Sequence, residues 1–101
     1  MSDLDQIMVV MNAAFDPHWR EAWTRRQVED SLILPHIYAI VIDPHGQETS
    51  EDSTPAGFIL VRRTLGEEEL LLIAIHPDHR GKGLGRKLME HFLTTARDNG
   101  A

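Results

Sequence analysis

Apolar residues recur at helical spacing in two segments near the N-terminus. Ser2 is placed to cap a helix whose apolar positions then repeat every three or four residues: Leu4, Ile7, Met8, Met11, Ala14 and Phe15. This pattern predicts a helix over residues 3 to 15. Thr24 and Gln27 fit a capping box ahead of Val28 and Leu32, which predicts a second helix over residues 24 to 32.

Three apolar runs of strand length follow: His36 to Ile42, Ala56 to Thr64, and Glu69 to Ile75. The polar stretch from Gln47 to Pro55 has no periodicity, so we expect a mobile loop there. Leu65-Gly66-Glu67 is a tight connection, which predicts an antiparallel hairpin between the second and third strands. The uninterrupted apolar run from Leu70 to Ile75 predicts a strand that is covered on both faces and central in the sheet.

A third helix is predicted from Gly83 to Asp98, where Leu84, Leu88, Phe92 and Ala96 recur every four residues ahead of Asn99-Gly100 as a stop. The element order is therefore α-α-β-β-β-α, without an internal repeat. We expect one α/β domain of the α+β type over residues 1–101, with a mixed, mostly antiparallel sheet and flanking helices.

Composition narrows the classes of function. The chain has 101 residues and no cysteine, which excludes disulfides, thiolate zinc sites and a cysteine nucleophile. A net charge of -6 argues against general nucleic-acid binding, and no apolar run approaches the roughly 20 residues of a membrane span. The N-terminus is acidic where a signal peptide is basic, so a cytoplasmic location is expected.

Against this acidic background, one segment is locally basic. From Arg80 to Lys87 there are four basic residues and no acidic one, and glycines stand at positions 81, 83 and 85. The segment joins an apolar strand to a helix, and a helix start offers unpaired N–H groups and partial positive charge. Glycine lets a phosphate approach the backbone closely. The pattern predicts an anion site for phosphate groups.

Two common phosphate-binding motifs do not fit this segment. A Walker A loop needs Gly-Lys-Ser/Thr, whereas Gly85 is followed by Arg86-Lys87-Leu88; a dinucleotide fingerprint needs Gly-x-Gly-x-x-Gly inside a βαβ unit. The remaining alternative is that the glycines only shape a turn. His76 and His79 straddle a proline bend without an obvious third ligand, so we expect no metal.

The glycine-rich segment resembles the Arg/Gln-x-x-Gly-x-Gly/Ala motif of GNAT acetyltransferases: it reads Arg80-Gly81-Lys82-Gly83-Leu84-Gly85. The residues before it resemble the strand and bend that precede this motif in the family: Ile73-Ala74-Ile75-His76-Pro77-Asp78-His79. The resemblance implies that acetyl-CoA is the cosubstrate. Backbone groups of Ile73, Ala74 and Ile75 would pair with the pantetheine arm. The N–H groups from Arg80 to Gly85 would take the pyrophosphate, with the charge of Arg86 nearby.

On the acceptor side, Asp16-Pro17-His18-Trp19 and Trp23 resemble the early segment of ribosomal-protein-alanine N-acetyltransferases. This implies an amine acceptor, with a protein N-terminus as one candidate. The alternative for Trp19 and Trp23 is packing over the sheet edge. By the resemblance to GNAT acetyltransferases, Glu69 stands where the histone-acetylating branch of that family has its general base. The alternative is that Glu67, Glu68 and Glu69 form a solvated hairpin end.

In the family, the last helix leads to further strands and a helix that form the other wall of the acetyl-CoA cleft and, in the N-terminal acetylating branch, carry a tyrosine acid. The sequence ends at Ala101, before that part, and Tyr38 on the first strand does not correspond to that tyrosine. Three functions remain open: an N-acetyltransferase, a non-catalytic acetyl-CoA or CoA binding module, and an interaction module in which a second chain completes the exposed strand edge, giving a homo-oligomer.

Overall fold

The computed structural model describes residues 1–15 and 23–100. The elements are α1 (Asp3–Ala14), α2 (Arg25–Ile33), β1 (Ile37–Ile42), β2 (Gly57–Thr64), β3 (Glu67–Ile75), a 3-10 turn (Pro77–His79) and α3 (Leu84–Asp98). The predicted order α-α-β-β-β-α is confirmed, and the observed bounds lie within about two residues of the predicted ones, which is the usual uncertainty at element ends.

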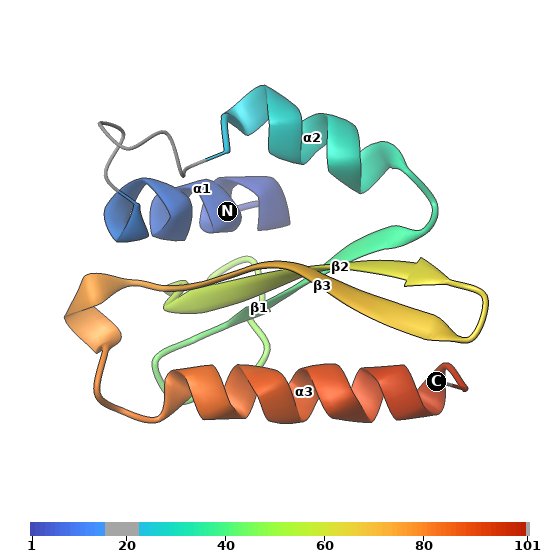
Figure 1. The fold of residues 1–101 in the computed structure, drawn as a ribbon. Helices are drawn as coiled ribbons and strands as arrows, with labels where there is room; N and C mark the ends of the chain where they lie inside the picture. The colour runs from blue at the N-terminus through green and yellow to red at the C-terminus, as the bar shows by residue number, and fades with distance from the viewer. Residues whose placement is uncertain (16–22, 101) are drawn as a thin grey trace.

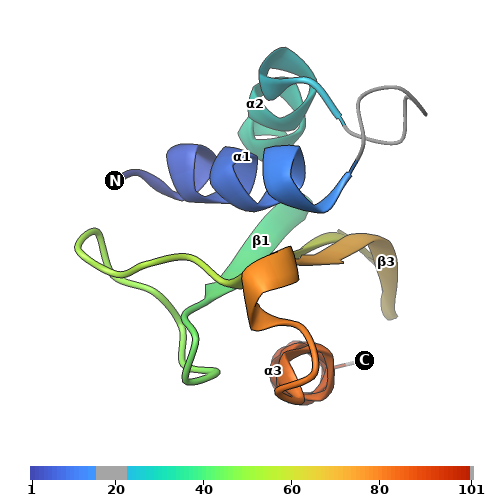
Figure 2. The same ribbon diagram turned by 90° about the vertical axis from the view of Figure 1, so that its left-hand side faces the viewer.

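The molecule has three layers, with α1 and α2 on one face of the sheet and α3 on the other (Figure 1). Figure 2 shows the same layers from the side, with α3 alone below the sheet. Successive side chains of β2 point to opposite faces of the sheet, so apolar residues along β2 serve both layers. Phe58 and Leu60 belong to the core under α1 and α2, and Ile59 and Val61 belong to the core over α3. All four side chains are fully buried.

The helix starts follow the predicted caps. The N–H of Asp5 donates to the hydroxyl oxygen of Ser2 at 3.2 Å, which begins α1. At α2, the N–H of Gln27 donates to Thr24 Oγ1 at 3.1 Å and the N–H of Thr24 donates to Gln27 Oε1 at 2.7 Å, which is the reciprocal capping box. Both local predictions are confirmed because a cap depends on residues only three positions apart.

The sheet has the order β1-β2-β3 with both pairs antiparallel, so the predicted hairpin is confirmed. The prediction of a central third strand is wrong for the described residues: β2 is central, and β3 lies at an edge. The apolar run in β3 reflects cover from α1 on one face and α3 on the other, and it carries no information about lateral neighbours.

A bulge interrupts the β2–β3 pairing, because Leu60 pairs with Leu72 and the next residue, Val61, pairs with Leu70. Leu71 is therefore the extra residue, and it packs with Leu72 against the core under α1 and α2. The alternation of side chains is reversed on the N-terminal side of the bulge. Leu70 consequently shares the α3 face with its partner Val61.

The loop between β1 and β2 has no helix or strand of its own, as predicted, but it is tied to two helices. The amide of the fully buried Gln6 in α1 donates to the carbonyl of Ser50 at 2.8 Å and accepts from Thr49 Oγ1 at 2.6 Å. On the other side, His91 Nε2 in α3 lies 2.9 Å from the carbonyl oxygen of Gly46. None of the helices in the described ranges is long and apolar enough to cross a membrane.

Candidate functional site

The connection between β3 and α3 has the backbone conformation that its glycines require. After the 3-10 turn, Gly81 and Gly83 have φ values of 81° and 75°, in the left-handed region that side chains with a Cβ rarely adopt. Nothing lies within 4 Å of the position of a Cβ on Gly81, Gly83 or Gly85. The turn therefore requires glycine at 81 and 83, whereas at Gly85, which is helical, only an approaching ligand would require it.

The start of α3 has no side-chain cap. Gly83 is the N-cap residue, and no side chain in residues 1–15 or 23–100 accepts a hydrogen bond from the first N–H groups of the helix. Leu84, Leu88 and Phe92 fix the helix by burying its inner face against β2. A rigid helix start with unpaired N–H groups is favourable for an anion, because those groups and the helix dipole both present positive charge.

The basic side chains of this segment point to different neighbours. Arg80 donates to the carbonyl of Ala14 at the end of α1, at 3.4 Å. Lys82 Nζ lies 3.3 Å from His79 Nδ1, and Arg86 lies 3.8 Å from Glu90 one turn along α3. The Lys87 stem fills the space that a side chain on Gly46 would occupy. Lys87 therefore supports the β1–β2 loop, and the other three cations lie in the motif itself or just after it.

A hollow of about 390 Å³ lies at the C-terminal half of β3. It is lined by the three β3 residues expected to pair with pantetheine, together with Arg80 and the end of α1: Ala14, Phe15, Ile73, Ala74, Ile75 and Arg80. The structure thus brings together two parts of the expected cosubstrate site, the strand edge and the first residue of the glycine motif. Sequence reasoning missed Ala14 and Phe15, which gave no signal beyond their helical spacing.

The acidic hairpin end is divided between the two faces of the sheet. Glu69 forms an ion pair with Arg62 across the hairpin, and its side chain is 55% exposed. Glu68 is on the α3 face, only 3% exposed, and accepts hydrogen bonds from Tyr38 Oη at 3.2 Å, Arg63 Nε at 3.1 Å and Asn99 Nδ2 at 3.3 Å. Burial and the neighbouring Glu68 carboxylate raise the pKa of Tyr38 above its ordinary value. Glu69 and Glu68 therefore have different environments, which the sequence did not separate.

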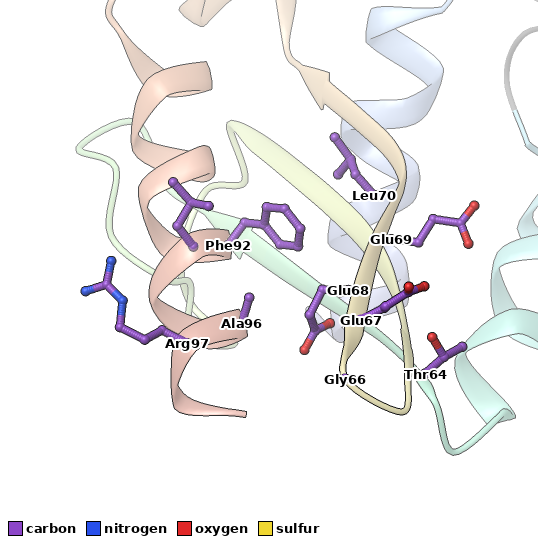
Figure 3. Close-up of a pocket in the computed structure, with 10 residues that line it drawn as sticks. Thr64, Gly66, Glu67, Glu68, Glu69, Leu70, Phe92, Ala96 and Arg97 are labelled. Atoms are coloured by element: carbon purple, nitrogen blue, oxygen red, sulfur yellow. The ribbon is translucent and has the colours of Figure 1, made fainter. Parts of the chain in front are cut away.

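A larger hollow, of about 830 Å³, separates the first half of β3 from the second half of α3. Figure 3 shows Phe92 and Ala96 of α3 facing Leu70 and Glu68 of β3 across it, while Glu69 points away from α3. This hollow has an apolar floor and an acidic rim at the hairpin end. It lies along the same strand as the smaller hollow, toward the opposite end.

The histidines and tryptophans singled out in the sequence have modest roles in the described structure. His76 Nδ1 accepts from the N–H of Asp78 at 3.1 Å, which stabilises the bend. Within residues 1–15 and 23–100, no group of three His, Asp or Glu side chains is arranged to hold a metal ion. Trp23 is partly buried against the core under α1 and α2. Trp19 and the rest of the Asp16-Pro17-His18-Trp19 segment lie outside the described residues.

Comparison with known proteins agrees with this geometry. Residues 4–101 match the Acetyltransferase (GNAT) family. The crystal structure of the ribosomal-protein-S18-alanine N-acetyltransferase from Escherichia coli superposes with a TM-score of 0.76 at 22% identity, over 97% of this chain and 56% of that one. That identity is low, so the superposition supports the shared fold alone.

Curated relatives match over shorter stretches. The L-amino acid N-acyltransferase MnaT of Escherichia coli (strain K12) is 57% identical over 28 residues, which is 28% of this chain and 16% of that protein. The streptothricin acetyltransferase of Streptomyces lavendulae is 42% identical over 52 residues, or 50% of this chain and 28% of that one. The matched part of this chain thus spans less than a third of the length of either relative. The family match over nearly the whole chain, together with the strand, glycine turn and helix start described above, shows that this chain belongs to the GNAT family of acetyltransferases.

Proposed function

We propose that this chain binds acetyl-CoA along the outer edge of β3 and at the start of α3, and that it transfers the acetyl group to a primary amine. The observation that carries the proposal is the continuity of the site. The edge at Ile73, Ala74 and Ile75 borders an apolar hollow that ends at Arg80, and the glycine turn and uncapped helix start follow directly. This order matches a ligand with an acyl group, a long neutral arm and a pyrophosphate.

Each part of the site would bind a different part of the cosubstrate. Backbone groups of Ile73 to Ile75 would pair with the amides of the pantetheine arm, as an added strand pairs with a sheet edge. The N–H groups of the turn and of Leu84 and Gly85 would donate to the pyrophosphate, with Arg80, Lys82 and Arg86 supplying positive charge. The binding should weaken with added salt, because these cations are exposed.

For the transfer step, we propose Glu69 as the general base. An amine nitrogen attacks the thioester carbonyl, the C–N bond forms as the C–S bond breaks, and Glu69 takes a proton from the nitrogen while the CoA thiolate leaves. Glu69 is suited to this by its solvent access and by its position on the strand that holds the acyl donor. Its ion pair with Arg62 would have to open or move for the amine to reach the carboxylate.

The experiment is steady-state acetyl transfer at saturating acetyl-CoA, with Glu69→Gln compared with Glu67→Gln as the matched control. Glu67 is exposed and two residues away on the same strand. We expect Glu69→Gln to lose about 10²-fold or more in rate, the usual scale for removing a general base, and Glu67→Gln to remain near the unsubstituted rate. Equal rates for the two variants would refute the role of Glu69.

The acceptor is proposed to be a primary amine, with a protein N-terminus as the first candidate. Support for this comes from the fold shared with an enzyme named for acetylating a ribosomal-protein alanine. Comparing a peptide with a free N-terminal alanine against the same peptide carrying a blocked N-terminus and a free lysine tests it. Transfer to the lysine peptide alone would contradict this choice of acceptor.

A non-catalytic acetyl-CoA or CoA binding module is the second candidate. The observation that favours it is the ion pair between Glu69 and Arg62, which occupies the candidate general base. CoA binding by calorimetry with no acetyl transfer to any tested amine would support this candidate over the enzyme.

A further inference from the structure

The N-terminal half of β3 consists of two blocks of identical residues. Three glutamates, Glu67 to Glu69, are followed by three leucines, Leu70 to Leu72. Sliding this segment by one residue along β2 replaces glutamate with glutamate and leucine with leucine, except where the two blocks meet. A one-residue slip also moves each side chain to the opposite face of the sheet. The sequence therefore specifies the register of this segment weakly, and another feature must fix it.

The observed register contains the bulge at Leu71. On the C-terminal side of the bulge, Leu60 pairs with Leu72. On its N-terminal side, Val61 pairs with Leu70. Without the bulge, Val61 would pair with Leu71, and the hairpin loop would lengthen by one residue. Because hairpin loops of two and of three residues are both common, the turn permits both registers.

The carboxylate of Glu68 is buried in the observed register. Its side chain is 3% exposed and accepts hydrogen bonds from Tyr38 Oη, Arg63 Nε and Asn99 Nδ2. These donors come from β1, from β2 and from the C-cap residue of α3. A buried carboxylate requires such partners, and hydrogen bonds to a charged group are the stronger ones. The three donors form one carboxylate site on the α3 face.

Glu68 and Glu69 compete for this carboxylate site. In the observed register Glu68 occupies it, and Glu69 pairs with Arg62 and points away from α3 (Figure 3). In the slipped register Glu69 would lie opposite Arg63 on the α3 face, and Arg62 would lie opposite Leu70. Either glutamate can therefore satisfy the buried donors. Only the observed register leaves Glu69 on the face of α1 and α2.

We propose that Glu68 is a positioning residue for Glu69: by occupying the buried carboxylate site, it holds the bulged register and keeps Glu69 on the face of α1 and α2. The consequence for acetyl transfer rests on the proposed function, in which Glu69 is the general base. The hold of Glu68 on the register is a separate property of the hairpin and can be measured without any turnover.

The register change would leave the proposed cosubstrate site in place. Ile73 to Ile75 pair with β2 on the C-terminal side of the bulge, and this pairing is the same in both registers. Replacing Glu68 should therefore leave the KM for acetyl-CoA nearly unchanged. It should lower kcat by about 10²-fold, the scale for losing a general base, because Glu69 turns to the α3 face. A general loss of folded protein would not reverse the face of Glu69.

The test is NMR spectroscopy of the hairpin beside steady-state kinetics. Backbone protons of Arg62 lie opposite those of residue 69 in the observed register and opposite those of Leu70 in the slipped one. We expect Glu68→Ala to give the Arg62–Leu70 contact. Glu68→Gln keeps the shape of the side chain and serves as the second variant; losing the charge should shift the ratio of registers about tenfold or more toward the slipped one. Glu69→Ala, the matched control, should keep the observed contact.

The outcomes separate this proposal from the proposed function. Contacts of Arg62 with residue 69 alone in both Glu68 variants would overturn the proposal, whatever the activity. A slipped register with unchanged kcat, in a protein that loses activity on Glu69→Gln, would also overturn it. A full rate for Glu69→Gln would instead refute the general base of the proposed function, and the NMR contacts would still decide whether Glu68 holds the register.

Discussion

Replacing Gly85 with alanine separates a role in ligand binding from a role in folding. Gly85 is the second residue of α3, its φ is not in the left-handed region, and nothing lies within 4 Å of an added Cβ. Alanine is the better helix former by up to about 1 kcal/mol. The fold should therefore become more stable, with a Tm higher by about 4–8 °C for each kcal/mol in a domain of this size.

The same methyl group should weaken acetyl-CoA binding. It projects into the space where the pyrophosphate would approach the helix start, so it lengthens or removes a hydrogen bond to a charged group. Such a bond contributes about 1.5–3 kcal/mol. Since about 1.4 kcal/mol changes a Kd tenfold, we expect the affinity to fall by about 10- to 150-fold. Gly83 is less suitable for this test, because its left-handed φ of 75° would strain any replacement.

The assay is calorimetric titration with acetyl-CoA beside thermal unfolding, for Gly85→Ala and for Thr94→Ala. Thr94 is exposed on the same helix and remote from the glycine turn, so its replacement should raise stability without changing affinity. Gly85→Ala with higher stability and unchanged affinity would show that the ligand does not approach Gly85. A large loss of stability would show that the helix start depends on this glycine for folding.

Two further predictions concern residues outside the glycine turn. Tyr38 is the only tyrosine, so tyrosinate absorbance reports it directly: its pKa should lie above the ordinary value near 10, chiefly through burial, and Glu68→Gln should lower it part of the way. Because the pKa of Tyr38 is higher in the folded state, the contribution of protonated Tyr38 to the free energy of unfolding is complete below the unfolded-state pKa. This contribution is lost as the pH rises through the folded-state pKa. A Tyr38 pKa at the ordinary value would contradict the network around Glu68. Gln6→Ala should lower the free energy of unfolding, measured with urea, by about 1–3 kcal/mol, because the hydrogen-bonding groups of Thr49 and Ser50 lose their buried partner. Asn12→Ala, on the exposed face of α1, should change it little. Equal costs for the two variants would show that Gln6 does not hold the loop.

Local signals accounted for most of the correct predictions. Ser2, Thr24 and Gln27 act within one helical turn, and the glycines at 81 and 83 meet a backbone requirement that lies in the turn itself. The alternation of strands and helices likewise follows from the spacing of apolar residues. These features need no knowledge of distant contacts, so the sequence alone is enough to predict them.

The faces of β3 could not be predicted in the same way. Counting back in twos from Ile73, which packs toward α3, places Glu69 on the α3 face. The bulge at Leu71 reverses the alternation, so Glu68 is on that face and Glu69 pairs with Arg62 on the other. A bulge depends on how β2 and β3 pack together, and no residue in this stretch predicts it.

Lateral position and long-range tethers also could not be predicted from the sequence. An apolar run does not reveal whether a strand has one neighbour or two, so β3 was expected to be central. Gln6 resembles any polar helix residue, yet it is fully buried and bonds to a loop more than forty positions away. Ala14 and Phe15 line the hollow beside Ile73 only because α1 ends over β3.

The most direct test of acetyl-CoA binding at this site is a titration of ¹⁵N-labelled protein with acetyl-CoA, followed by backbone amide NMR signals. We expect the largest shifts to fall in two groups, Ile73 to Ile75 and Gly81 to Gly85, while the signals of α2 hardly move. Saturable shifts confined to α2 or to the β1–β2 loop, or no shifts at all, would contradict acetyl-CoA binding at the edge of β3 and the start of α3.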